Sequence, residues 1–197
     1  MQTKKAIIIF TKNPQKGNVK TRIAATLGDD KALQIYKKLI VHTHSIVVNL
    51  KIDTYIFYSD AIIKNDIWSE KVFFKMLQNG VTLGEKMADA FSVVFAKKYD
   101  SVCIIGSDCY ELNPAIIENA FVKLQSVDCV IGPAFDGGYY LLGTNAYNGQ
   151  LFQNIQWSTD TVFDNTLAIC TTLNITTDLT VKLNDVDTEN EVPAHWL

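Results

Sequence analysis

Basic side chains are concentrated between residues 12 and 22 of the chain. Four residues of this stretch are basic, and the first acid in the sequence is Asp29. Arg22 is the only arginine among the 18 Lys and Arg residues. A guanidinium can hold a phosphate through two parallel hydrogen bonds, whereas an ammonium acts as a point charge. The stretch therefore predicts a phosphate site. The alternative is a solvated basic loop with an incidental arginine.

The place of this basic loop in the sequence supports the phosphate prediction. The loop follows the apolar run 6–10 and leads into the helix-permissive segment 23–28, a pattern typical of strand, loop and helix in an α/β domain. Backbone N–H groups at the helix start would add to an anion site. Two loop residues, Lys20 and Arg22, are also catalytic candidates because they would neutralise phosphate charge. The residues expected to bind phosphate or nucleotide are Lys12, Gly17, Lys20, Thr21 and Arg22.

Four acids follow predicted strands directly. They are Asp108 after the run 101–105, Asp136 after 128–132, and Asp185 and Asp187 after a short strand expected at 181–183. In doubly wound sheets, ligands bind at the carboxyl ends of the strands. We therefore expect Lys20, Arg22, Asp108, Asp136 and Asp187 to surround a single cleft.

The strand-end acids predict a metal site. Ionising Asp108 at a buried strand end is costly unless a cation or N–H groups stabilise the charge. We expect Asp185 and Asp187 to point to opposite sides of an extended segment, so that at most one of them shares a metal with Asp108. Carboxylate ligands completed by water and phosphate favour Mg²⁺ or Mn²⁺ over Zn²⁺. The alternative roles are helix or turn capping by Asp108, and capping of the last segment by Asp187 or Thr188.

Two glycine-containing motifs each have a structural and a functional interpretation. Asp136-Gly137-Gly138 is typical of a hairpin turn, but the aromatic segment after it suits the wall of a pocket, with Asp136 as general base or acceptor contact. Gly80 and Gly84 open a helical segment and would let a nucleobase or ribose approach the backbone. The alternative for these two glycines is a capped core helix.

Composition bounds the class of protein. The chain has 197 residues, which suits one domain over residues 1–197. A net charge of −3 does not favour binding to nucleic acid or to an anionic membrane. No apolar run approaches the roughly 20 residues that span a bilayer. Four cysteines without a C-x-x-C pair, and no secretory signal, predict a cytoplasmic protein with reduced, mostly buried thiols.

Strand-like and helix-like segments alternate along the chain. Nearly continuous apolar runs at 101–106 and 128–132 suit central strands, and the segment 113–124 starts with an Asn N-cap followed by Pro. This alternation predicts an α/β fold with a mostly parallel sheet and helices on both faces. The further expected strands are 6–10, 52–58 and 71–77, and the further expected helices are 30–49 and the segment from 83 to 95.

Six motifs together resemble one known family. They are Lys12-x-Pro14-x-x-Gly17-x-Val19-Lys20-Thr21-Arg22, Leu83-Gly84-Glu85-Lys86-Met87, Gly106-Ser107-Asp108-Cys109, Gly132-Pro133-Ala134-x-Asp136-Gly137-Gly138-Tyr139-Tyr140-Leu141, Trp157-Ser158-Thr159 and Asp185-Val186-Asp187-Thr188. In this order they resemble the DUF2064 family, also called the selenodomain- or arsenosugar-associated glycosyltransferases, over residues 5–190. More remotely, the chain resembles the molybdenum-cofactor and phospholactate guanylyltransferases.

This resemblance implies a nucleotide-diphospho-sugar transferase of GT-A fold, a three-layer Rossmann-like arrangement with a mostly parallel central sheet. It implies a nucleotide sugar or NTP as donor, with Mg²⁺ held by Asp108. The expected activity is glycosyl transfer from an NDP-sugar to a small-molecule acceptor. The alternatives are nucleotidyl transfer with release of pyrophosphate, and a catalytically silent nucleotide-binding module. The chain departs from the family pattern at Tyr110 (usually Pro), at Lys86 (usually Arg) and in the ending 189–192.

Overall fold

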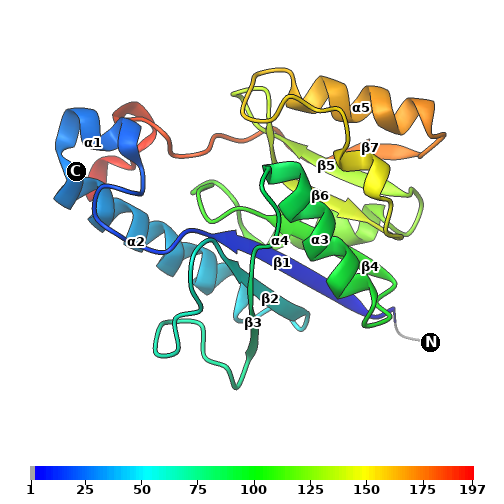
Figure 1. Ribbon diagram of the computed structural model, residues 1–197, viewed down its shortest axis with the longest axis horizontal. Coiled ribbons are helices and arrows are strands. Elements are labelled where there is room, and N and C mark those ends of the chain that lie inside the picture. The colour runs from blue at the N-terminus through cyan, green and yellow to red at the C-terminus, as the bar shows by residue number, and fades with distance from the viewer. Residues whose placement is uncertain (1–2) are drawn as a thin grey trace.

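The computed structural model describes residues 3–197 and shows a seven-stranded sheet flanked by helices (Figure 1). The strand order is β3-β2-β1-β4-β6-β5-β7. The strands are β1 (Lys5–Thr11), β2 (Asp53–Tyr58), β3 (Phe73–Leu77), β4 (Ser101–Ile105), β5 (Cys129–Pro133), β6 (Tyr139–Thr144) and β7 (Thr177–Leu179). The helices are α1 (Thr21–Leu27), α2 (Asp29–Val47), α3 (Leu83–Phe95), α4 (Pro114–Lys123) and α5 (Val162–Thr172), and three short 3-10 helices are η1 (Gly149–Phe152), η2 (Glu189–Glu191) and η3 (Ala194–Trp196).

The sheet is mostly parallel, as predicted. β1 pairs in parallel with β2 and β4, β2 with β3, and β5 with β7. β6 is the exception and runs antiparallel to both β4 and β5. The reason is local, because the short Asp136–Gly138 turn joins β5 to β6 and a connection of that length reverses the chain. The carboxyl ends of β1 and β4 therefore lie at one sheet edge together with the start of β6.

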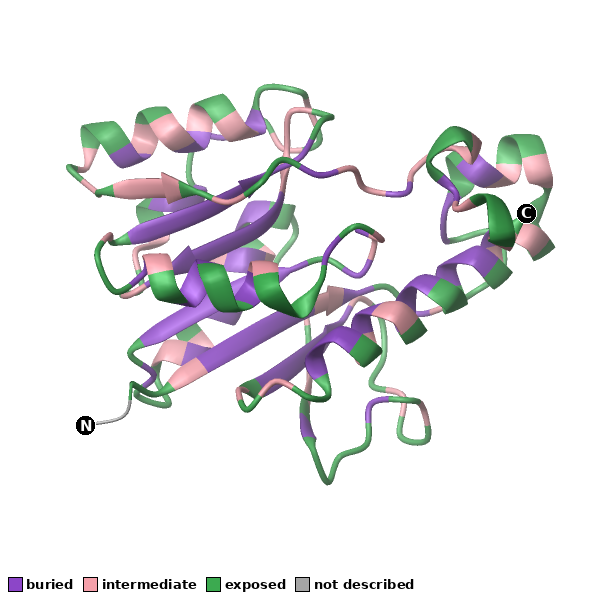
Figure 2. Ribbon diagram, turned by 180° about the vertical axis from the view of Figure 1, so that it is seen from behind, coloured by how far each residue is buried: buried purple, intermediate pink, exposed green. Residues whose placement is uncertain are grey.

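Helices cover both faces of the sheet and give three layers. The side chains of β1 alternate, so that Ile7 and Ile9 pack with α2 and α4 while Ala6 and Ile8 pack with α3 and α5. The central strands are buried along almost their whole length, as the purple ribbon of Figure 2 shows. This is the pattern expected of strands covered on both sides.

Two helix starts follow directly from their sequences. Asn113 caps α4 by accepting a hydrogen bond from Ile116 N at 3.2 Å, and Pro114 takes the first helical position. Thr82 and Glu85 form a reciprocal capping box at the start of α3. The predicted N-cap of α4 is confirmed, and Asp108 does not take part in it.

The last strand lies elsewhere than predicted. We expected a strand at 181–183, whereas β7 is Thr177–Leu179 and Leu183 makes only an isolated bridge with Ala134. Residues 180–188, the C-terminal strap, leave the sheet edge and cross toward α1 and α2 (Figure 1). Along the way Val186 N donates to Asp108 O at 2.9 Å. The strap therefore passes directly beside the end of β4.

Tyr110, one of the departures from the family pattern, has a packing role. Its ring lies 4.9 Å from the ring of Trp196 and 4.8 Å from that of His42 on α2. It thus joins the loop after β4 to the segment that follows the C-terminal strap. A proline at this position would supply no such aromatic contact.

The four cysteines are free and buried, as predicted. Across the described part of the chain, each helix is too short or too polar to cross a bilayer.

Candidate functional site

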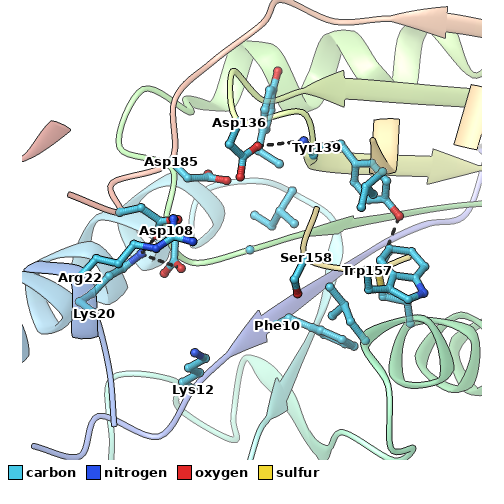
Figure 3. A pocket seen from close by; sticks show the side chains of 18 of the residues that line it. Phe10, Lys12, Lys20, Arg22, Asp108, Asp136, Tyr139, Trp157, Ser158 and Asp185 are labelled. Carbon is cyan, nitrogen blue, oxygen red and sulfur yellow. Dashed lines mark hydrogen bonds and ion pairs between the residues drawn. The ribbon is translucent and has the colours of Figure 1, made fainter. Parts of the chain in front are cut away.

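A cavity of about 660 Å³ lies at the carboxyl ends of β1 and β4, beside the start of β6. It collects residues from the basic loop, the strand ends and the C-terminal strap (Figure 3). Hydrogen-bonded partners in it lie up to 167 positions apart in the sequence. Eight of the predicted site residues line it: Lys12, Lys20, Thr21, Arg22, Asp108, Asp136, Asp185 and Asp187. The expected single cleft is therefore present in the structure.

An ion-pair cluster forms the charged end of this cavity. The Nζ atom of Lys20 lies 2.8 Å from Asp108 Oδ2 and 3.0 Å from Asp187 Oδ1. The lysine side chain is 4% exposed, and each of the two carboxylates is 39% exposed. Burial disfavours the charged form of Lys20, but the two carboxylates outweigh it and raise its pKa above the ordinary value. Lys20 is therefore a buried ammonium held by two acids.

The backbone at Lys20 has an unusual conformation. Its φ of 48° lies in the left-handed region, which costs about 1 kcal/mol or more for a residue other than glycine. Lys20 immediately precedes α1, so this conformation turns the chain from the loop into the helix. The Lys20 ammonium lies toward the strand-end acids.

Arg22 lies at the outer rim of the same cluster. Its side chain is 74% exposed, and Nη1 reaches Asp187 Oδ2 at 3.5 Å. An exposed ion pair of this length contributes little to stability. Most of the guanidinium's hydrogen-bonding capacity thus remains available to a ligand in the cavity.

Asp108 carries a buried acceptor without a partner. Its Oδ2 atom binds Lys20, whereas Oδ1 is one of the few buried side-chain polar atoms in residues 3–197 that lack a hydrogen bond. A buried, unsatisfied carboxylate oxygen is destabilising and calls for a donor or a cation. Asp108 therefore has one buried oxygen that no group of the described residues satisfies.

The prediction that Asp185 and Asp187 point to opposite sides was wrong. Both line the cavity, while Val186 between them is buried in the core. Residues two apart on an extended segment share a face, and the residue between them takes the other. The acids at this end of the cavity are therefore close together. Burial of Asp185 is the larger cause, and the charge of Asp108 the next, of the rise in the pKa of Asp185 to about 7.

Asp136 is both a turn residue and a cavity residue. Its Oδ1 accepts a hydrogen bond from Gly138 N at 2.9 Å within the β5–β6 hairpin. Gly137 has a φ of 88°, and a Cβ there would overlap the backbone of Asp160. The Asp136 carboxylate is exposed and lies on the Asp185 side of the cavity (Figure 3). The two interpretations of this motif are therefore compatible.

The other end of the cavity is apolar and aromatic. Its side chains are Phe10, Leu83, Met87, Ile104, Tyr139 and Trp157. Tyr139 and Trp157 meet edge to face at 6.4 Å, and the Tyr139 hydroxyl donates to Met87 Sδ at 3.8 Å. The predicted aromatic wall after the hairpin turn is present, since Tyr139 and Tyr140 both line the cavity.

Three glycines predicted to bind phosphate or nucleotide do not line the cavity: Gly17, Gly80 and Gly84. Gly80 has a φ of 129°, and a Cβ there would lie 2.7 Å from the Cβ of Glu85 in the capping box of α3. A Cβ at Gly84 would overlap the indole of Trp157. The absent side chains of Gly80 and Gly84 therefore allow close packing around the start of α3, which is the structural alternative considered for these two glycines.

Tyr36 was not among the predicted site residues. Its hydroxyl accepts from Lys12 N at 2.7 Å and lies 3.2 Å from Ser107 Oγ, so it joins the basic loop to the loop after β4. It lies on the buried face of α2, where an aromatic residue is typical of an ordinary core. The helical pattern alone held no signal that Tyr36 reaches the cavity.

The carboxylates of the cavity suit a metal ion whose coordination is completed by water and phosphate. Within residues 3–197, no group of three or more His, Cys, Asp or Glu is arranged to hold a metal ion. Asp108 and Asp187 nevertheless both bind the Lys20 ammonium, and Asp108 retains an unpaired oxygen. One or two carboxylates completed by water and phosphate is the usual coordination of Mg²⁺. The residues suit that arrangement and not a closed structural metal site.

Comparison with known proteins identifies related sequences and folds. A family model, DUF2064, described as an uncharacterized protein conserved in bacteria, matches residues 43–159. A solved structure from Desulfovibrio desulfuricans G20, provisionally described as a nucleotide-diphospho-sugar transferase, is 31% identical with a TM-score of 0.86, and the match covers 95% of this chain and 84% of the other. A search of curated proteins finds no match.

More distant structures share the fold. The 4-diphosphocytidyl-2C-methyl-D-erythritol synthase from Anaerococcus prevotii DSM 20548 is 9% identical with a TM-score of 0.60, over 96% of this chain and 93% of that one. The inositol-1-phosphate CTP transferase from T. maritima is 11% identical with a TM-score of 0.56, over 98% and 93%. At these identities the likeness concerns the arrangement of the chain alone, and it agrees with the expected GT-A-like fold.

Proposed function

The chain belongs to the DUF2064 family, and from this premise we propose that it is a metal-dependent transferase that uses a nucleotide-linked donor. The preferred donor class is an NDP-sugar, from which the glycosyl group is transferred. The observation that carries the proposal is the charged end of the cavity. There a buried lysine, an exposed arginine and strand-end carboxylates meet beside an apolar wall.

The chain's own cations would hold the diphosphate. Arg22 is exposed at the rim and offers a planar set of donors that matches phosphate oxygens. Lys20 and Lys12 line the same cavity and would add point charges. Together they would neutralise the donor and hold its leaving diphosphate in one orientation, which lowers the entropic part of the barrier.

The acids would hold Mg²⁺ or Mn²⁺. Asp108 offers its unpaired Oδ1, and Asp187 and Asp185 are the further carboxylates in reach of the cavity. When bound, such a cation supplies Lewis-acid stabilisation of charge on the leaving diphosphate.

Asp136 is the candidate base toward the acceptor. In glycosyl transfer the bond between the sugar C1 and the diphosphate oxygen breaks, and a bond forms from C1 to an acceptor hydroxyl oxygen. The hydroxyl proton must leave, and the exposed Asp136 carboxylate on the Asp185 side of the cavity would accept it. The apolar wall would exclude water, which competes with the acceptor.

Nucleotidyl transfer is the second candidate function. It is favoured by the distant structures of similar fold, one of which is named a CTP transferase and another a diphosphocytidyl synthase. In that reaction an acceptor phosphate attacks the α-phosphate of an NTP, and pyrophosphate leaves. The products separate the two reactions, because glycosyl transfer from an NDP-sugar releases an NDP.

A thermal-shift screen of nucleotides and nucleotide sugars, each with and without Mg²⁺, tests the proposal. A ligand at about 100 times its dissociation constant stabilises the native state by about 2.7 kcal/mol. We expect stabilisation to require both partners and Asp108→Asn to abolish it while the protein remains folded. The matched control is Asp178→Asn, an acid paired with Lys123 at 2.6 Å outside the cavity.

Two results would contradict the proposal. If Asp108→Asn binds metal and nucleotide like the wild type, Asp108 is not a ligand and the metal-dependent function fails. If a nucleotide binds but no NDP or pyrophosphate is released with any acceptor, the chain is a nucleotide-binding module without catalysis.

A further inference from the structure

Lys20 lies between the two carboxylates that the proposed function gives to a metal ion. Its Nζ is 2.8 Å from Asp108 Oδ2 and 3.0 Å from Asp187 Oδ1, and its side chain is almost fully buried. Figure 3 shows Lys20, at the end of the basic loop, and Arg22, in the first turn of α1, extending toward the region of Asp108. A divalent cation binds carboxylate oxygens at about 2.0–2.6 Å. An ammonium and a metal ion therefore cannot both lie between these two oxygens. A metal ion bound instead to the unpaired Oδ1 of Asp108 would lie next to the Lys20 ammonium, whose like charge would repel it.

We propose that Lys20 is an internal counter-cation that keeps metal out of the site until a phosphate-bearing ligand gives its ammonium another partner. The inference rests on the proposed function, because it takes Asp108 and Asp187 as the acids that hold the metal. It adds a condition on metal binding. The metal ion binds to the two carboxylates only together with a phosphate-bearing ligand, so the reaction starts from the complex that holds both.

The charges around Lys20 explain why it holds its place in the empty site. Two carboxylates with partly buried oxygens need a positive charge, and removing one partner of such a cluster leaves the other uncompensated. The lysine supplies that charge from within the chain. A metal ion arriving alone would have to displace it and leave a buried ammonium without an anion.

A phosphate-bearing ligand removes this penalty. One cavity is lined by Lys12, Lys20 and Arg22. A diphosphate bound in this cavity would therefore lie close to the Lys20 side chain. The ammonium then exchanges carboxylate oxygens for phosphate oxygens, and the carboxylates are free for the cation that accompanies the phosphate. The Lys20 ammonium has an anionic partner both before and after the exchange, and the carboxylates likewise have a cation. The two ligands thus raise each other's affinity, as thermodynamic linkage requires.

Metal binding without any nucleotide tests the inference. The measurement is the dissociation constant for Mn²⁺ alone, obtained by electron paramagnetic resonance of free Mn²⁺, for the wild type and for Lys20→Met. Methionine has a similar length and carries no charge. We expect Lys20→Met to bind Mn²⁺ at least about tenfold more tightly than the wild type, and Mn²⁺ to raise the melting temperature of the variant more than that of the wild type.

Two further variants make the result specific. Lys16→Met removes a lysine from the same loop that is paired with one exposed acid, Asp30, at 2.8 Å, and it should bind Mn²⁺ like the wild type. The double variant Lys20→Met/Asp187→Asn removes one carboxylate as well and should lose the gained affinity. If Lys20→Met is unstable without metal, the gain should appear as a larger rise of its melting temperature on addition of Mn²⁺.

The inference is overturned if wild type and Lys20→Met bind Mn²⁺ with equal affinity, or if neither binds it. It is also overturned if Lys16→Met gains as much as Lys20→Met. These outcomes are separate from failure of the proposed function, which is decided by nucleotide binding and product release. A protein that transfers a glycosyl group yet binds Mn²⁺ equally well with and without Lys20 would keep its function and lose this inference.

Discussion

Replacing Asp185 with Asn should make the protein more stable at alkaline pH. Asp185 is half-buried, and its pKa is raised from 3.8 to about 7 by burial first and by the neighbouring carboxylate of Asp108 second. The folded protein therefore keeps this proton up to about pH 7, whereas the unfolded chain releases it near pH 4. Wild-type stability then falls as the pH rises between those values, and the loss persists above pH 7. Asparagine keeps the shape and cannot ionise.

The size of the effect follows from the shift. A change of about three pKa units corresponds at most to about 4 kcal/mol, at 1.36 kcal/mol for each unit. Solvent screens a half-buried group, so we expect Asp185→Asn to gain about 1–2 kcal/mol at pH 8. At pH 5 the gain should be less than half as large, because the folded wild type is still protonated there.

Urea denaturation at pH 5 and pH 8, with EDTA present to remove metal ions, measures both free energies of unfolding. Asp164→Asn, an exposed acid on α5 outside the cavity, shows the effect of removing one surface charge. Equal stabilisation by Asp185→Asn at both pH values, or destabilisation at pH 8, would contradict a raised pKa of Asp185 in the folded protein.

Two further substitutions test other parts of the site. Arg22→Lys keeps the charge but loses the planar set of donors. The binding free energy of the nucleotide donor, measured by isothermal titration calorimetry, should therefore weaken by about 1–2 kcal/mol while stability changes little. An unchanged dissociation constant would show that Arg22 does not bind the donor. Gly84→Ala places a Cβ against the Trp157 indole and 2.8 Å from Phe152 O, so crowding of about 1–3 kcal/mol should exceed the helix gain of about 1 kcal/mol. A lower melting temperature and altered tryptophan fluorescence are expected, and an unchanged spectrum with higher stability would contradict the close contact.

Much of the fold was predictable because it depends on local patterns. The apolar runs gave β1, β4 and β5, and Asn113 with Pro114 marked the start of α4. Strand and helix alternation implied a mostly parallel sheet, and its topology implied that the strand-end residues share one edge. β7 was misplaced because a three-residue edge strand has too little periodicity to be recognised in the sequence.

The contacts within the site were less predictable. The sequence predicted Lys20 and Asp108 as site residues, but not that they pair with each other, because that contact depends on how the basic loop packs against the loop after β4. Tyr36 was missed because a buried aromatic on a helix has the same pattern whether or not its hydroxyl reaches a cavity. The shared orientation of Asp185 and Asp187 was predictable, because residues two apart on an extended segment share a face.

The C-terminal strap also sets the time at which the charged end of the site can form during synthesis. Lys20 is made early, whereas its partner Asp187 lies 167 residues later. A nascent chain on the ribosome that already contains the sheet strands β1 to β6 still lacks this acid. The ion-pair cluster is therefore completed only when the strap emerges and crosses to α1. Because chains grow from the N-terminus, a partly made protein cannot hold the full set of charges that the proposed chemistry needs.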